Sequence, residues 1–209
     1  MRLLTGIFLT IFFLSSCNLT INKSIRVKDG EVRSTSLTTV NGNIDVGRDC
    51  EVHGTCRTVN GHIEIGAHSI VEDLQTVNGR IDVEESVHVR GNIASVNGSV
   101  YCEKGTKVDE EVSTVNGKIR LKNSSVLGYL KTVNGDIFLE DGTTIEGNIF
   151  VEGDSDKGRV NVRISENSKV NGDIIVDPDR RNVTVYLSSG GVVEGNIENA
   201  RMIHEESEE

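Results

Sequence analysis

The amino-acid sequence predicts an all-β fold: a right-handed, single-stranded parallel β-helix (a β-solenoid) with about 18–19 residues per coil and roughly eight coils. Three observations lead to this class. The tripeptide Val-Asn-Gly recurs at nearly constant spacing, apolar residues alternate within each repeat, and no segment shows a sustained helical period. A unit of this size cannot bury its apolar side alone. Stacked copies bury it continuously, with each strand pairing in parallel with its counterpart one coil further on.

The Val-Asn-Gly repeat defines the coil. Its first six copies are separated by steps of 19, 18, 19, 19 and 18 residues, and a seventh at Val170 follows 37 residues later, which equals two further steps. A threonine or serine precedes each of the first six copies. Their valines are Val40, Val59, Val77, Val96, Val115 and Val133. Spacing this regular predicts the same bend at one corner of every coil.

Three apolar positions in each repeat predict the strands. The first position holds Ile44, Ile63, Ile81, Val100, Ile119 and Ile137. The second, two residues further on, holds Val46, Ile65, Val83, Cys102, Leu121 and Leu139. The third, six residues beyond the second, holds Val52, Val71, Val89, Val108, Leu127 and Ile145. The local alternation has the period of a β-strand, so each coil is expected to have about three faces.

The recurring asparagine and glycine are predicted to build the corner itself. Stacked in register, the asparagine amides form a ladder, because each amide both donates and accepts hydrogen bonds. The predicted ladder contains Asn41, Asn60, Asn78, Asn97, Asn116 and Asn134. The glycine that follows is expected to supply a positive φ angle at the corner. A polar ligand-binding stripe is the weaker alternative.

Residues 1–16 are predicted to be a secretory signal peptide. Arg2 supplies a positive charge, and the apolar run that follows is too short to be a comfortable membrane span. The sequence Leu14-Ser15-Ser16-Cys17 resembles the lipobox of bacterial lipoproteins, which implies cleavage before Cys17 and lipidation of its thiol. Several acyl chains on one residue anchor a protein durably. An ordinary signal peptide with a chance cysteine is the alternative.

The rest of the chain is predicted to have three parts. Residues 17–23 form a lipidated tether, residues 24–203 the β-solenoid domain, and residues 204–209 an acidic C-terminal tail. Asn18 follows the cysteine, which by resemblance to the enteric sorting rule favours the outer membrane. We therefore expect a protein of the bacterial cell envelope, on its periplasmic or surface face, that contacts the membrane through the N-terminal lipid.

The composition argues against several kinds of partner. The net charge is −10 and becomes −11 without Arg2, which disfavours nucleic acid and tight docking on anionic lipid headgroups. Tryptophan is absent and aromatic residues make up only 4% of the chain, whereas sugar-binding clefts usually present aromatic platforms.

The cysteines of the mature chain do not suggest a disulfide framework, because three remain besides Cys17. Cys56 and Cys102 occupy apolar positions of the repeat and are expected in the core. Cys50 lies off these positions, and a disulfide with Cys56 across a bend is the weaker alternative. No Cys-x-x-Cys or His-Cys cluster suggests a metal site.

No catalytic residue, metal ligand or cofactor site is predicted. Asp45, Glu64 and Asp82 would stack about 4.8 Å apart, a spacing that would suit Ca²⁺ or an acid–base pair. Their column continues with an aromatic residue and an arginine, and Arg80 and His62 stand beside it, so a solvated, charge-balanced face is favoured. None of the histidines pairs with a serine or cysteine at a repeated position.

Segments of the form apolar-x-Gly-x-apolar, such as Val89-Arg90-Gly91-Asn92-Ile93, resemble the bactofilins. These are polymer-forming bacterial cytoskeletal proteins whose right-handed β-helices join end to end. The coils from Val40 to Ile197 are also similar to adhesin-type β-solenoid domains of exported bacterial proteins.

Apolar residues six apart are also typical of the left-handed hexapeptide acyltransferases. The 19-residue steps break that pattern, and an acyl donor would be missing outside the cytoplasm.

The expected function is that of a non-catalytic envelope scaffold or adhesin-like interaction protein. Its expected partners are the membrane, a second copy bound end to end, and an envelope polysaccharide or protein. The alternative is a carbohydrate-binding or carbohydrate-active protein. It would use the two polar loops predicted after Val151, at Gly153–Gly158 and Asp177–Asn182, near Asp154 and Asp179.

Overall fold

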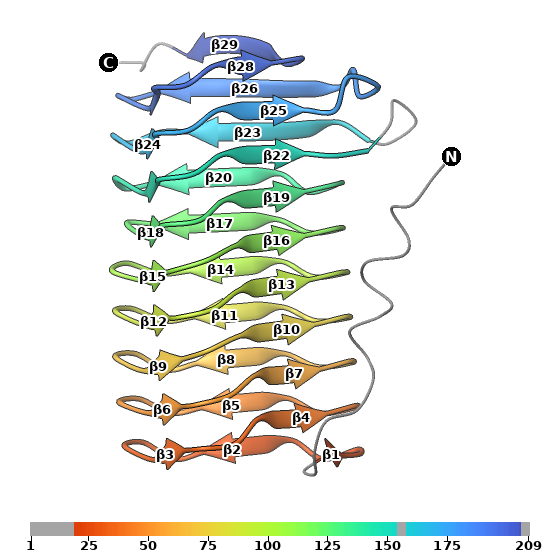
Figure 1. Cartoon of the computed structure of the whole chain (residues 1–209), viewed down its shortest axis with the longest axis vertical. Coiled ribbons are helices and arrows are strands. Elements are labelled where there is room, and N and C mark those ends of the chain that lie inside the picture. The colour runs from red at the N-terminus through yellow and green to blue at the C-terminus, as the bar shows by residue number, and fades with distance from the viewer. Residues whose placement is uncertain (1–18, 154–157, 206–209) are drawn as a thin grey trace.

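The protein is a stack of β-coils. The computed structural model describes residues 19–153 and 158–205, and no helix occurs among them. Three parallel sheets of ten, ten and nine strands run along the stack, which makes about nine turns of about 19 residues (Figure 1). The predicted all-β solenoid is confirmed, with about one turn more than expected.

The strands of each sheet follow one another from coil to coil. Sheet A comprises β1 (Leu19–Thr20), β4 (Leu37–Thr39), β7 (Cys56–Thr58), β10 (Leu74–Thr76), β13 (Ile93–Ser95), β16 (Val112–Thr114), β19 (Leu130–Thr132), β22 (Ile149–Val151), β25 (Ile174–Val176) and β28 (Ile197–Glu198). Sheet B comprises β2 (Ile25–Val27), β5 (Ile44–Val46), β8 (Ile63–Ile65), β11 (Ile81–Val83), β14 (Val100–Cys102), β17 (Ile119–Lys122), β20 (Ile137–Glu140), β23 (Val160–Ile164), β26 (Val183–Ser188) and β29 (Arg201–Glu205). Sheet C comprises β3 (Val32–Arg33), β6 (Glu51–Val52), β9 (Ile70–Val71), β12 (His88–Val89), β15 (Lys107–Val108), β18 (Ser125–Val126), β21 (Thr144–Ile145), β24 (Lys169–Val170) and β27 (Val192–Val193).

Each coil visits sheets A, B and C in turn. In Figure 1 the chain rises while the strands of sheet A run to the right in front and those of sheet B return behind, so the winding is right-handed. This hand separates the fold from the left-handed hexapeptide alternative.

The core is built from columns of identical or similar apolar side chains. Ile44, Ile63 and Ile81 stand directly above one another in sheet B, and all three are fully buried. β-Branched side chains suit this arrangement because they are stiff and pack well on a pleated surface. Alternate residues of each strand face outward, which explains the period of two in the sequence.

Two positions of the predicted repeat are wrong. Val126, not Leu127, fills the third apolar position of its coil: Val126 pairs with Val108 and is buried, whereas Leu127 is 45% exposed. This coil has 18 residues, and it is shortened between sheets B and C. The seventh Val-Asn-Gly copy is also displaced, because Val170 pairs with Ile145 in sheet C rather than lying at the corner between sheets A and B.

The glycine of the Val-Asn-Gly corner has a different role from the one predicted. None of the first six copies places its glycine in the left-handed region. A Cβ atom on Gly98 would instead overlap the carbonyl oxygen of Gly79 in the coil below. In the first five copies the preceding buried hydroxyl donates to the carbonyl one coil below; Thr58 Oγ1, for example, lies 2.8 Å from the oxygen of Gly42. In the sixth copy Thr132 Oγ1 donates to Gly135 of its own coil instead. Glycine is required because two backbones meet closely, not because φ is positive.

Positive φ angles occur instead at the turn between sheets B and C. Asp49, His68, Ser86, Gly105 and Asn123 occupy this place in successive coils, with φ between 42° and 77°. Glycine and asparagine tolerate the left-handed region most easily. The column accepts other residues as well, so it leaves no glycine motif in the sequence.

The described solenoid extends beyond the predicted domain limits at both ends. β1 pairs with β4, so the first strand already begins within the segment expected to be a tether. β29 continues to Glu205, inside the expected acidic tail. Cys17 and residues 206–209 lie outside the described residues, and no helix in the described part is long and apolar enough to cross a membrane.

The three described cysteines are buried free thiols. Cys56 and Cys102 lie in the core as expected. Cys50, which lies off the apolar positions of the repeat, is a core residue as well and is not paired with Cys56: it is 2% exposed, and its Sγ donates to the carbonyl oxygen of Lys28 at 3.1 Å. It occupies a column of small buried residues after the left-handed turn, and the repeat of larger apolar residues does not include this column.

Candidate functional site

The predicted asparagines stand in one row at the corner between sheets A and B. Each Nδ2 donates to the Oδ1 of the asparagine one coil below, over 2.6–2.9 Å. The row is Asn22, Asn41, Asn60, Asn78, Asn97, Asn116 and Asn134, and it therefore begins one rung earlier than predicted. At its end, Asn134 Oδ1 is buried and accepts no hydrogen bond from a described residue. Between Asn22 and Asn134 each amide gives one donor and one acceptor to the ladder, so the row forms part of the corner's own hydrogen bonding.

The acidic column of sheet B has the predicted register, because Glu64 pairs with both Asp45 and Asp82. Arg26 Nη2 lies 3.3 Å from Asp45 Oδ2, and Arg80 Nε donates to Asp82 Oδ2 at 2.6 Å. Across the described residues, no three His, Cys, Asp or Glu side chains converge in a way that could hold a metal ion. The column therefore fits a charge-balanced face.

The cysteines and histidines form no nucleophilic pair in the described part of the chain. Burial raises the pKa of Cys56 and that of Cys102 to about 12, so both remain protonated thiols at neutral pH. His88 Nε2 lies 2.8 Å from Asp109 Oδ2 on sheet C. Hydrogen bonds from Lys107 and then His88 hold the pKa of Asp109 below its ordinary value. This group is an ion-pair network on a solvated strand.

The two irregular loops are joined by one buried cation. Asp154 lies outside the described residues, and Asp179 is exposed in the turn after β25. The neighbouring Arg180 is only 1% exposed. Its Nη1 donates to the carbonyl oxygen of Glu152 and its Nη2 to that of Gly158, both at 2.9 Å. Arg180 therefore holds the two ends of the segment between β22 and β23.

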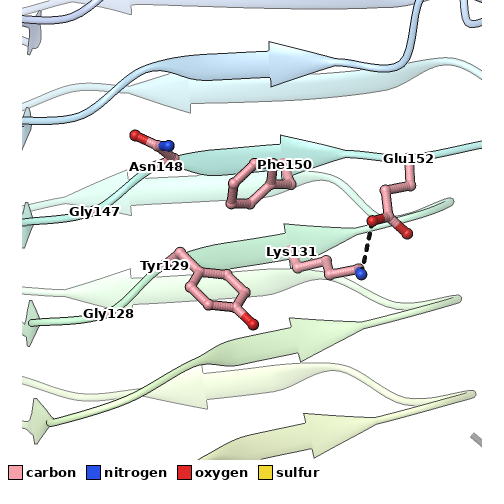
Figure 2. Close-up of a pocket in the computed structure, with 7 residues that line it drawn as sticks. All are labelled: Gly128, Tyr129, Lys131, Gly147, Asn148, Phe150 and Glu152. Carbon is pink, nitrogen blue, oxygen red and sulfur yellow. Dashed lines mark ion pairs between the residues drawn. The ribbon is translucent and has the colours of Figure 1, made fainter. Parts of the chain in front are cut away.

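A shallow, open hollow of about 550 Å³ lies on the outer face of sheet A just before this segment. Figure 2 shows the rings of Tyr129 and Phe150 on neighbouring coils, with an ion pair beside them. The ring centroids are 5.5 Å apart and the ring planes are nearly perpendicular, a favourable edge-to-face contact. The lining residues are Gly128, Tyr129, Lys131, Gly147, Asn148, Phe150 and Glu152.

The polar groups around the hollow are partly engaged. Lys131 Nζ lies 2.7 Å from Glu152 Oε1, while Glu152 Oε2 is buried without a hydrogen bond to a described residue. Tyr129 donates its hydroxyl to Glu111 Oε2 at 2.6 Å, and this bond raises the pKa of Tyr129 to about 12. The hollow thus combines a fixed apolar platform with adjacent charged groups, a combination typical of small-ligand sites.

Sequence reasoning missed this hollow because it followed the inward side chains. Phe150 is the outward middle residue of β22, and Tyr129 directly precedes β19. The signal was available as two aromatic residues about one coil apart in a chain with few aromatic residues. Arg180 left no such signal, since a buried arginine in a polar loop looks like any solvated cation.

No protein-family model, no curated protein and no solved structure matches this chain.

Proposed function

We propose that the protein is an exported, lipid-anchored rod that acts as a non-catalytic scaffold or interaction protein of the bacterial envelope. The observation that carries the proposal is the continuity of the three sheets from the first described coil to the last. Nine steps of the ordinary strand spacing give a rod on the order of 40 Å long. Such a rod holds a surface at a set distance from its anchor, which we place at Cys17 by the lipobox resemblance, on the outer membrane.

The last coil supplies a free end in this proposal. Val192 in sheet C and Met202 in sheet B are 43% and 50% exposed, and their strands pair on one side only. Unpaired strand edges are templates for further pairing. An envelope protein, a polysaccharide or a second copy of the chain would meet the rod at this end.

Replacing Cys17 by serine tests the anchor. The variant is expected to take up no labelled fatty acid and to leave the detergent-rich phase on phase partition, since the serine hydroxyl is not the lipidated group. Ser16→Ala, which keeps a small residue before the cleavage position, serves as the control and should behave like the wild type. Incorporation of label by the Cys17→Ser chain would refute lipidation at this residue.

The hollow on sheet A favours a second candidate function, the binding of an envelope carbohydrate. Tyr129→Ala and Phe150→Ala should each weaken saturable polysaccharide binding by about tenfold, because each removes an apolar ring from the platform. Tyr101→Ala, on sheet B, removes a ring elsewhere and should leave binding unchanged. Binding of the wild-type chain and of the three variants is measured on a polysaccharide array. Equal losses in all three variants, or no saturable binding by the wild type, would exclude the hollow as a carbohydrate site.

A further inference from the structure

The two ends of the rod differ in charge. The first described coil, residues 19–36, contains four cations and two acids, for a net charge of +2. The last 18 described residues, 188–205, contain one cation and three acids, for a net charge of −2. The whole chain carries −10. The first coil of this strongly acidic protein is therefore basic, and it lies next to the proposed lipid anchor.

The cations of the first coil are available to solvent. Its four cations are all exposed: Lys23, Arg26, Lys28 and Arg33. The two arginines pair with Asp45 and Glu31, and the Arg26 side chain is still 78% exposed. Lys23 and Lys28 form no ion pair with a described residue. Ion pairs within the described part of the protein therefore do not neutralise the positive charge of this coil.

The same coil exposes large apolar side chains. Ile21 is 64% exposed and Val32 is 62% exposed, the two highest values among the exposed large hydrophobic residues. Both belong to the first coil, which is covered by a further coil on one side only, and Val32 faces outward from sheet C because it pairs with Glu51. Exposed apolar residues among basic ones are typical of surfaces that rest in the headgroup region of a membrane.

The position of the first strand specifies what lies against this end. Leu19 already belongs to β1, which pairs with β4 at the edge of sheet A (Figure 1). Cys17 is two residues earlier in the sequence. Two residues span at most about 7 Å, so a lipid on Cys17 brings the bilayer to the first coil itself.

We propose that the first coil docks on an anionic lipid bilayer through Lys23, Lys28, Ile21 and Val32, so that the rod stands with its last coil away from the membrane. This inference rests on the proposed lipidation of Cys17. It also restricts assembly: a second copy cannot stack on the first coil of an anchored chain, and only the last coil remains free for an end-to-end contact.

The orientation can be measured on the lipidated full chain in vesicles of equal parts phosphatidylglycerol and phosphatidylcholine. A fluorophore is attached at Ser34→Cys in the first coil or at Met202→Cys in the last, while the native thiols are buried and do not react. A quencher attached to lipid headgroups should quench the label at position 34 and spare the label at position 202. Co-flotation with the vesicles reports anchoring separately.

Charge reversal distinguishes docking from tethering. Lys23→Glu with Lys28→Glu should reduce the ratio of docked to undocked chains by more than about 25-fold, since each lost basic residue near an anionic surface removes about fivefold and each new carboxylate is repelled. The variant should still co-float with the vesicles, because the lipid on Cys17 continues to anchor it. Lys104→Glu with Lys118→Glu, an equal charge change on exposed mid-rod residues, should leave the quenching unchanged.

Each outcome is decisive. Quenching at position 34 that responds to the first-coil variant and to removal of phosphatidylglycerol supports docking. Equal quenching of both labels would mean a rod lying flat, and quenching indifferent to charge would mean a tether alone; either overturns the inference. Concentration-dependent contact between position-34 labels would show a second copy on this end and would also overturn it. Failure to co-float would overturn the proposed anchor itself.

Discussion

Replacing Gly98 by alanine is expected to lower the free energy of unfolding by about 3 kcal/mol or more. The added methyl group would overlap the carbonyl oxygen of Gly79 and crowd Ser95 Oγ. The neighbours cannot yield cheaply, because that carbonyl belongs to a coil paired on both sides. That carbonyl also accepts the hydroxyl of Ser95 at 3.3 Å, so separating the two corners would weaken this bond too.

Denaturant unfolding followed by circular dichroism measures the effect, and two other glycines isolate its cause. Gly158→Ala meets open space without a positive φ angle and should change stability by less than about 0.5 kcal/mol. Gly30→Ala also meets open space but has φ of 72°, so it should cost about 1 kcal/mol through backbone strain alone. A loss for Gly98→Ala no larger than that for Gly30→Ala would contradict the close-approach explanation.

Much of this fold could be predicted because every coil of a solenoid has the same turns and the same pattern of buried side chains. The steps between the first six Val-Asn-Gly copies determined the coil length, and the alternation around Ile44 and Ile63 identified the inward side chains. Errors arose where a coil changed length. The shortening before Val126 shifted one core position, and the longer coils after Val151 placed a chance Val-Asn-Gly copy at Val170 in another sheet.

Other features depend on relations between coils that no single repeat contains. A close approach between glycine backbones arises only when two corners stack, so the sequence suggested the commoner use of glycine at positive φ. The hollow combines Tyr129 and Phe150 from successive coils. The net charge of −10 for the whole chain does not reveal that the first coil is basic. The expectation that anionic lipid would be disfavoured was based on that net charge. Summed charge describes long-range attraction, whereas a docked surface responds to the local charge.

Replacing Arg180 by methionine is expected to cost about 3 kcal/mol, the second large effect. The guanidinium donates to the carbonyl oxygens of Glu152 and Gly158 from a position that is 1% exposed. Methionine keeps much of the length and apolar volume but satisfies neither carbonyl, and each orphaned acceptor costs about 1–3 kcal/mol. The effect should therefore come from lost hydrogen bonds rather than from a cavity.

The neighbouring Arg181 offers a matched control, because the same substitution there removes an equal charge from an exposed side chain. Arg181→Met should leave the unfolding midpoint unchanged, and trypsin cleavage after Arg159 should accelerate only in the Arg180 variant. Arg159 is exposed and lies beside a carbonyl that Arg180 holds, so its cleavage reports local opening of the segment. If Arg180→Met lowers the midpoint without faster cleavage, the arginine stabilises the core but does not hold the segment. If both variants behave alike, net charge explains the effect. Faster cleavage confined to the Arg180 variant would show that this one buried cation holds the segment between β22 and β23, where the regular coils give way to the irregular ones.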